Sequence, residues 1–385
     1  MIKEKYDIIY NLSHTDLDGY GSQYMINVIK PLLTKTKIKF FNADYDEVTE
    51  KINLIFENVL KNKDKKMLFL ITDIGVSEKI IKKMNNFLRG NKNIDLTYKL
   101  LDHHKSNLET SKQNDWYICD TNKCGSSLTA DFVISEFNVS SPDVQEHLLN
   151  VGDFIEAHDI WKVDSEFFNQ SNYLSEALFS VPFINELEEV KRNFYMNFIF
   201  FFMKEFSENS YIVEDLEKNI NVIIKNAIKF MSPLENELEH ILNDRNLRTT
   251  HKVFYFQALQ YREFIKPNEI IDFNGKKGLL LYDTNGTLFQ YFSKYFLERF
   301  PEFNFMIHFK SNGKCSLRSA DNTDVSVIAK LLDYKEEGGG HPQASGCKIK
   351  VKQEPHSKNE AVKIVKNIIN EKLKNNQGNF NGKSQ

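Results

Sequence analysis

The chain has 385 residues, which is longer than one hydrophobic core usually supports, so the length alone predicts two domains. Hydrophobic residues make up 41% and charged residues 27%, and no apolar run approaches the roughly 20 residues that a membrane helix needs. The formal net charge of −3 excludes a broadly basic surface of the kind that grips duplex nucleic acid.

The N-terminal part of the chain, up to about residue 135, alternates short β-prone runs with longer amphipathic stretches. The predicted strands are 6–12, 67–71 and 96–101, and the predicted helices are 24–33, 46–61 and 77–88. This alternation is typical of βαβ units. We therefore expect an α/β domain with a parallel sheet over residues 1–165.

The rest of the chain changes character twice. Residues 144–262 are poor in strand signals and rich in helix-forming residues, which predicts a helical connecting segment at 166–270. Strands are predicted again at 278–282, 303–309, 314–318 and 347–351, with helices at 288–299 and 325–332. We expect a smaller α/β domain at 271–372, a cleft between the two lobes, and a disordered polar tail at 373–385.

The N-terminus and the cysteines bear on the cellular compartment. The first ten residues lack the pattern of a secretion signal, so we expect a cytoplasmic protein without a membrane partner. The cysteines Cys119, Cys124, Cys315 and Cys347 are too few and too scattered for a disulfide framework, and we interpret them as reduced thiols. Cys119 and Cys124 lack a second Cys or His pair that would complete a zinc site.

A short motif, HTDLD, follows the first predicted strand directly. In an extended chain, side chains alternate between faces, so His14, Asp16 and Asp18 would point to the same side. A Gly-Tyr-Gly turn comes next, and its glycines would let the backbone approach a metal or a phosphate closely. The motif therefore predicts a convergent set of three ligands.

Two further acidic motifs end predicted strands. Asp73 follows the second strand, and Asp102, His103 and His104 follow the third. Ligands of parallel sheets bind beyond the carboxyl ends of the strands, so three such motifs indicate one site. Caps and solvated turns are the alternative role for carboxylates after strands. Carboxylates packed this closely require cations to neutralise them.

Histidine and aspartate without a thiolate suit manganese, with magnesium or cobalt as alternatives. Two ions about 3.5–4 Å apart, bridged by Asp73, would activate water and stabilise charge on an attacked phosphorus. Phosphate-ester hydrolysis is the chemistry that this pattern predicts.

The three motifs together resemble those of the DHH phosphoesterase superfamily, which is named after the tripeptide found here as Asp102-His103-His104. The resemblance implies that His14 and Asp16 bind one metal ion, that Asp18 and His103 bind the other, and that Asp73 bridges them. It also implies that His104 faces the substrate phosphate as a catalytic residue. Asp102 would then orient the histidines, which metal sites generally require.

The family has a fourth motif that supplies one more aspartate ligand. Asp159 matches it best, because the following Ile-Trp resembles the oligoribonuclease branch, and Asp153 is the alternative. We interpret His158 as a residue outside the direct ligand set. The segment Gly125-Ser126-Ser127 would either place backbone amides near the metal site or cap a helix.

A glycine run precedes a histidine near the C-terminus. Considered alone, Gly338-Gly339-Gly340-His341 predicts a flexible turn, although its amides could also cradle an anion. With Arg318 and Ser319 in SLRSAD, it resembles the DHH-associated C-terminal domain, type A, of nucleotide-cleaving members. The resemblance implies that these residues bind a phosphate or a terminal nucleotide, whereas Arg318 alone could form a surface salt bridge.

We therefore expect a manganese-dependent exonuclease that hydrolyses short RNA to mononucleotides, as nanoRNases do, and that does not stably bind duplex nucleic acid. A homodimer is the oligomeric state considered beside a monomer. The alternatives are a phosphodiesterase acting on cyclic or linear dinucleotides of the c-di-AMP or pApA type, and an adenosine bisphosphate phosphatase. A catalytically inactive nucleotide-binding sensor is the alternative without enzymatic activity, although every metal position holds a competent ligand.

Overall fold

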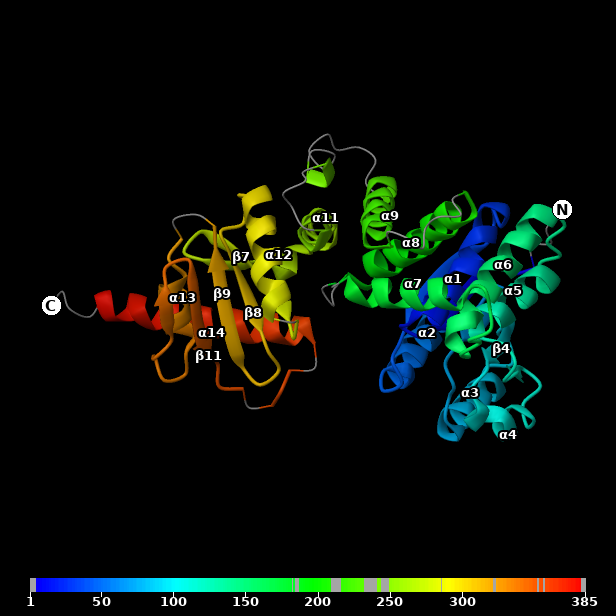
Figure 1. The fold of residues 1–385 in the computed structure, drawn as a ribbon. Coiled ribbons are helices and arrows are strands. Elements are labelled where there is room, and N and C mark those ends of the chain that lie inside the picture. Colours follow the sequence, from blue (N-terminus) through cyan, green and yellow to red (C-terminus); the bar gives the residue numbers. More distant parts are fainter. Residues whose placement is uncertain are drawn as a thin grey trace. The chain divides into compact units, whose positions relative to one another are not determined.

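The computed structural model describes residues 5–181, 183, 187–208, 216–231, 241–243, 249–284, 286–320, 323–351, 353–355 and 357–381. It consists of two compact units (Figure 1). The first contains the residues up to Ser180 together with Arg192–Ala227, and the second contains Val181–Lys191 and the residues from Ile228 onward. The predicted connector at 166–270 is thus divided between the two units. Within the described ranges, no helix has the length and apolar character needed to cross a bilayer.

The N-terminal unit is built on a five-stranded sheet in which every pairing is parallel. Its strands are β1 (Ile8–Ser13), β2 (Lys37–Asn42), β3 (Met67–Thr72), β4 (Leu96–Asp102) and β5 (Tyr117–Cys119), in the order β2-β1-β3-β4-β5. The predicted parallel α/β fold is confirmed, although the sequence reading omitted β2 and β5. Because all strands run the same way, the residues that follow them meet at one edge.

Helices cover both faces of this sheet, as their apolar periodicity requires. The described helices up to residue 231 are α1 (Leu17–Ile29), α2 (Val48–Lys61), α3 (Glu78–Gly90), α4 (Leu108–Ser111), α5 (Gly125–Glu136), α6 (Pro142–Asp159), α7 (Phe168–Ser180), α8 (Glu188–Glu208) and α9 (Leu216–Met231). Apolar residues of α2 and α3, such as Ile52 and Met84, share one core with Tyr10 and Phe69 of the strands. Helices α1, α5 and α6 pack together on the other side.

The C-terminal unit contains a six-stranded sheet of order β10-β11-β9-β8-β7-β6, in which only β7 and β8 pair in parallel. The strands are β6 (Ile271–Phe273), β7 (Lys276–Tyr282), β8 (Phe305–Phe309), β9 (Lys314–Ser319), β10 (Gly339–His341) and β11 (Ala344–Lys348), and the helices are α11 (Thr249–Phe264), α12 (Gly286–Arg299), α13 (Val325–Leu332) and α14 (Lys358–Asn381). Helix α14 crosses the strands (Figure 1) and shares their apolar core with α13. This is the second α/β region that the sequence predicts.

Two local predictions differ from the structure. The tail predicted to be disordered at 373–385 is helical as far as Asn381, because α14 continues through it, and its last four residues lie outside the described residues. The glycine run predicted as a turn forms β10, since Gly339–His341 pairs with β11. In β10, pairing with a neighbouring strand supplies the order that glycine lacks intrinsically.

Candidate metal centre

The HTDLD motif does not continue β1 in the extended form that the sequence reading assumed. Asp16 instead caps α1, with its Oδ1 accepting a hydrogen bond from the Gly19 amide at 2.9 Å, and Asp18 lies in the first helical turn. The predicted Gly-Tyr-Gly turn is therefore helical. A Cβ at Gly19 would lie 2.3 Å from the His14 carbonyl oxygen, so only glycine allows this tight passage. The side chains still meet, because His14 Nδ1 lies 2.6 Å from Asp16 Oδ2.

Asp73 lies at the centre of the group, directly after β3. Its side chain is buried, and its backbone adopts a φ of +54°, a conformation that non-glycine residues rarely adopt outside functional or strained sites. Its Oδ2 atom forms no hydrogen bond with the residues that the structure describes. Gly125 approaches so closely that a Cβ there would lie 2.5 Å from the Asp73 Cβ. The backbone at Gly125 therefore packs directly against the Asp73 side chain.

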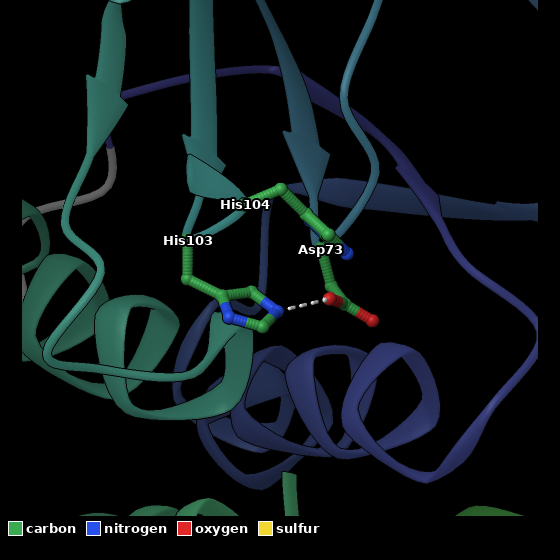
Figure 2. A group of neighbouring side chains, drawn as sticks. All are labelled: Asp73, His103 and His104. Atoms are coloured by element: carbon green, nitrogen blue, oxygen red, sulfur yellow. Dashed lines mark hydrogen bonds and ion pairs between the residues drawn. The ribbon is translucent and has the colours of Figure 1, made fainter. Parts of the chain in front are cut away.

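His103 joins the carboxylates from three elements. Its Nε2 atom lies 3.2 Å from Asp73 Oδ1, 3.3 Å from Asp159 Oδ2 and 3.8 Å from Asp18 Oδ2. Figure 2 shows the His103 ring pointing toward Asp73. Ligand atoms also converge in the sets His14-Asp16-Asp73 and Asp73-His103-His104. The structure therefore brings all six predicted metal ligands to one edge of the sheet.

The geometry distinguishes the two candidates for the fourth-motif ligand, Asp159 and Asp153. Asp159 ends α6 and places its Oδ2 near His103, and this oxygen forms no hydrogen bond among the described residues. Asp153 lies one and a half turns earlier and is exposed. His158 is absent from the groups of candidate ligands found in the described ranges, and its ring lies 6.1 Å from that of Trp161. The geometry favours Asp159.

Asp102 directs its carboxylate away from the cluster and into hydrogen bonds. Its Oδ1 lies 2.6 Å from His104 Nδ1, and its Oδ2 accepts hydrogen bonds from Asn107 at 2.7 Å and from Tyr117 at 2.6 Å. The hydrogen bond from His104 to Asp102 raises the pKa of His104. This arrangement fits the predicted orienting role of Asp102, and it leaves His104 Nε2 directed elsewhere.

Helix α5 begins at the cluster. The backbone amides of Gly125 and Ser126 donate to the two carboxylate oxygens of Asp18 at 2.6 and 2.7 Å, while Cys124 caps the helix. The segment from Gly125 to Ser127 therefore has both predicted roles. It forms the start of a helix, and the backbone amides that are free at this helix start bind Asp18 of the cluster. Buried Glu156 accepts a hydrogen bond from the Cys124 amide and pairs with Lys162.

The electrostatics of the cluster fit bound cations. Burial and the neighbouring Asp18 and Asp16 raise the pKa of Asp73 well above its usual range. Burial, followed by the same two aspartates, raises the pKa of Asp159 to about 9. Hydrogen-bond donors are too few to offset this repulsion, since Asp73 and Asp159 each retain a buried oxygen without one. Imidazole and carboxylate donors without thiolate match a pair of manganese-like ions, which His14, Asp16, Asp18, Asp73, His103 and Asp159 would hold.

The raised pKa of Asp159 predicts a pH-dependent stability of the metal-free protein. Its ordinary value of 3.8 rises to about 9 on folding, so the folded state retains a proton that the unfolded state loses. The free energy of unfolding should therefore fall as pH rises from about 4 to about 9, by at most about 1.4 kcal/mol per pH unit for this group.

Thermal unfolding of wild type and Asp159→Asn in chelator, between pH 5 and pH 9, measures this effect. We expect the Tm advantage of the variant to grow with pH and to disappear when manganese is added. A difference that does not change with pH would contradict the raised pKa.

The predicted phosphate-binding residues lie in the C-terminal unit. Arg318 of β9 is opposite Ala344 of β11, which is opposite His341 of β10, so the side chains of Arg318 and His341 share one face. Only Ala344 lies between them on that face, and Gly346 and Gly339 lie two positions further along the same face. Among the described residues, Arg318 forms no ion pair, and its Nη1 donates to the Leu317 carbonyl oxygen.

Three residues of this predicted group have structural roles of their own. Ser319 follows the opposite alternation, and its hydroxyl donates to the Thr323 carbonyl oxygen at 2.7 Å. At Gly338, a Cβ would lie 2.5 Å from the Ala329 carbonyl oxygen, so this glycine allows close packing against α13. Gly340 has a φ of +143°, which favours glycine. Arg318 and His341 thus remain the candidates for contact with an anion.

Comparison with known proteins finds one matching domain family and similar proteins. Residues 302–371 match the DHHA1 domain family. A 3′,5′-cyclic-nucleotide phosphodiesterase of Helicobacter pylori (strain ATCC 700392 / 26695) is 27% identical over 381 residues, which cover 94% of this chain and 99% of the relative. A crystal structure of an uncharacterized protein from Helicobacter pylori G27 superposes with a TM-score of 0.73 at 24% identity, covering 94% of this chain and 99% of that one. That protein shares the fold.

Proposed function

Because the chain belongs to the DHH superfamily and carries a DHHA1 domain, we propose that it is a metal-dependent nucleotide phosphodiesterase that hydrolyses short oligoribonucleotides to mononucleotides with manganese. The observation that carries this proposal is the buried cluster of Asp18, Asp73 and Asp159 around His103. Carboxylates this close to one another repel unless protons or bound cations neutralise them.

The residues of the site have different roles in the proposed hydrolysis. Two bound divalent ions would activate water and neutralise charge on the phosphate. His104, with Nδ1 fixed by Asp102, presents Nε2 as a donor to a phosphate oxygen. The raised pKa of His104, caused first by its hydrogen bond to Asp102, favours the imidazolium that can donate from this atom. The burial of Asp102 keeps this orientation fixed.

The C-terminal unit supports an oligonucleotide as the substrate. Arg318 and His341 share a face of the sheet with only small side chains between them, which suits a phosphate or a nucleotide sugar. We propose that Arg318 and His341 bind a phosphate of the substrate.

One observation favours a second candidate function. The Helicobacter pylori relative is named for activity on 3′,5′-cyclic nucleotides and aligns over almost its whole length. A cyclic mononucleotide is also a phosphodiester, so the same metal centre would serve for its hydrolysis.

A substrate panel tests the proposed function. Purified protein is stripped with chelator, reloaded with manganese, magnesium or cobalt, and given RNA of two to five nucleotides, pApA, 3′,5′-cyclic AMP and adenosine 3′,5′-bisphosphate. We expect the highest kcat/KM for short RNA with manganese and no activity in chelator. A preference for cyclic AMP would establish the second candidate, and inactivity on every substrate with every metal would refute both.

A further inference from the structure

An exposed tyrosine lies beside the metal centre and has no part in binding metal. Tyr45 follows β2, and 56% of its surface is exposed. Its ring centroid lies 5.2 Å from that of His14 and 6.3 Å from that of His104, and its hydroxyl lies 3.3 Å from His104 Nε2. A large aromatic ring thus lies on the solvent side of the two histidines.

The loop that carries Tyr45 is tied to the metal-binding loop. The Ala43 amide donates to the Ser13 carbonyl oxygen at 3.0 Å, and Thr15 donates a hydrogen bond to the Asp44 carboxylate. The Glu47 side chain accepts from the Asp44 amide at 3.2 Å. Tyr45 therefore projects from a backbone that hydrogen bonds hold beside the cluster, which lowers the entropic cost of using its ring to contact a ligand.

We propose that Tyr45 is a substrate-contacting residue on which a nucleobase stacks, so that the site selects nucleotides over other phosphate esters. This inference rests on the proposed function. A nucleobase lies one ribose away from its phosphate, and the Tyr45 ring lies one hydrogen bond away from the histidine expected to contact that phosphate. Every base has a π face, so such a platform accepts bases without strong sequence preference, as an enzyme for short RNA requires.

The contribution of the base is measured by comparing adenosine 5′-monophosphate with ribose 5-phosphate, which lacks the base. Calorimetric dissociation constants for both ligands are obtained with manganese-loaded wild type, Tyr45→Phe and Tyr45→Leu. We expect wild type and Tyr45→Phe to bind the nucleotide on the order of tenfold more tightly than the sugar phosphate, and Tyr45→Leu to lose most of this preference. Ribose 5-phosphate should bind all three proteins similarly.

Two results would overturn the inference. If Tyr45→Leu keeps the wild-type preference, the base does not contact this ring. If Tyr45→Phe loses the preference as completely as Tyr45→Leu, the hydroxyl rather than the ring carries it. Equal Tm values for the three proteins confirm that folding is unchanged, as expected for a half-exposed side chain. If the wild type is active in the substrate panel and Tyr45→Leu keeps the wild-type base preference, only the role of Tyr45 is refuted. Failure of the proposed function is a different outcome, in which the wild type is inactive in that panel.

Discussion

Replacing Asp73 with asparagine should abolish activity and yet stabilise the metal-free protein. Asp73 is the carboxylate expected to bridge two ions, and its loss should lower kcat on the order of 10³-fold, since such ions supply several kcal/mol of transition-state stabilisation. In the metal-free protein the same carboxylate is buried among other aspartates, which raise its pKa. Asparagine removes this repulsion, so Tm in chelator should rise, by about 2–4 °C for each kcal/mol gained.

Asp153→Asn is the matched control, because Asp153 is an exposed aspartate and the alternative fourth-motif ligand. It should leave kcat, manganese affinity and Tm near the wild-type values. Steady-state kinetics, manganese titration calorimetry and thermal unfolding in chelator measure the three quantities. If Asp73→Asn destabilises the metal-free protein, the carboxylate contributes to folding in a way that the cluster geometry does not explain. If Asp153→Asn abolishes manganese binding, Asp159 is not the completing ligand.

Local sequence patterns predict the positions of some residues of the metal centre but not the conformation of others. Asp73 and Asp102 could be placed together because each follows an apolar run, and parallel strands bring such positions to one edge. The extended conformation predicted for Asp16 and Asp18 is wrong. The strand ends at Ser13, and Asp16 caps a helix that begins at Leu17, as the capping preference of aspartate favours.

Tyr45 shows what sequence patterns leave out. It follows β2, an edge strand with two lysines that is absent from the predicted strands, so no local pattern connects Tyr45 to the metal motifs. The strand order β2-β1-β3 brings it beside His14, and that order depends on tertiary packing. Likewise, the tie between Gly125 and Asp18 joins residues more than 100 positions apart, and the helix-cap pattern alone did not reveal it.

Replacing His103 or His104 with glutamine should have different effects on manganese affinity and on kcat. His103 Nε2 lies within 3.8 Å of carboxylate oxygens from Asp18, Asp73 and Asp159, as expected for a metal ligand. His104 instead uses Nδ1 to bind Asp102 and directs Nε2 toward Tyr45. His103→Gln should therefore weaken manganese binding at least about 10- to 100-fold. His104→Gln should keep manganese affinity within a few-fold and lower kcat roughly 10²- to 10⁴-fold, the usual range for a positioned acid or base.

Manganese titration calorimetry and single-turnover kinetics on a dinucleotide separate these two effects, and each variant serves as the control for the other. His104 also lies close enough to Asp73 and His103 to share a metal ion. If His104→Gln loses manganese affinity as fully as His103→Gln, His104 is a ligand and the phosphate needs another donor. The half-exposed Tyr45 hydroxyl, 3.3 Å from His104 Nε2, would then be the nearest candidate, and Tyr45→Phe would lower kcat as well.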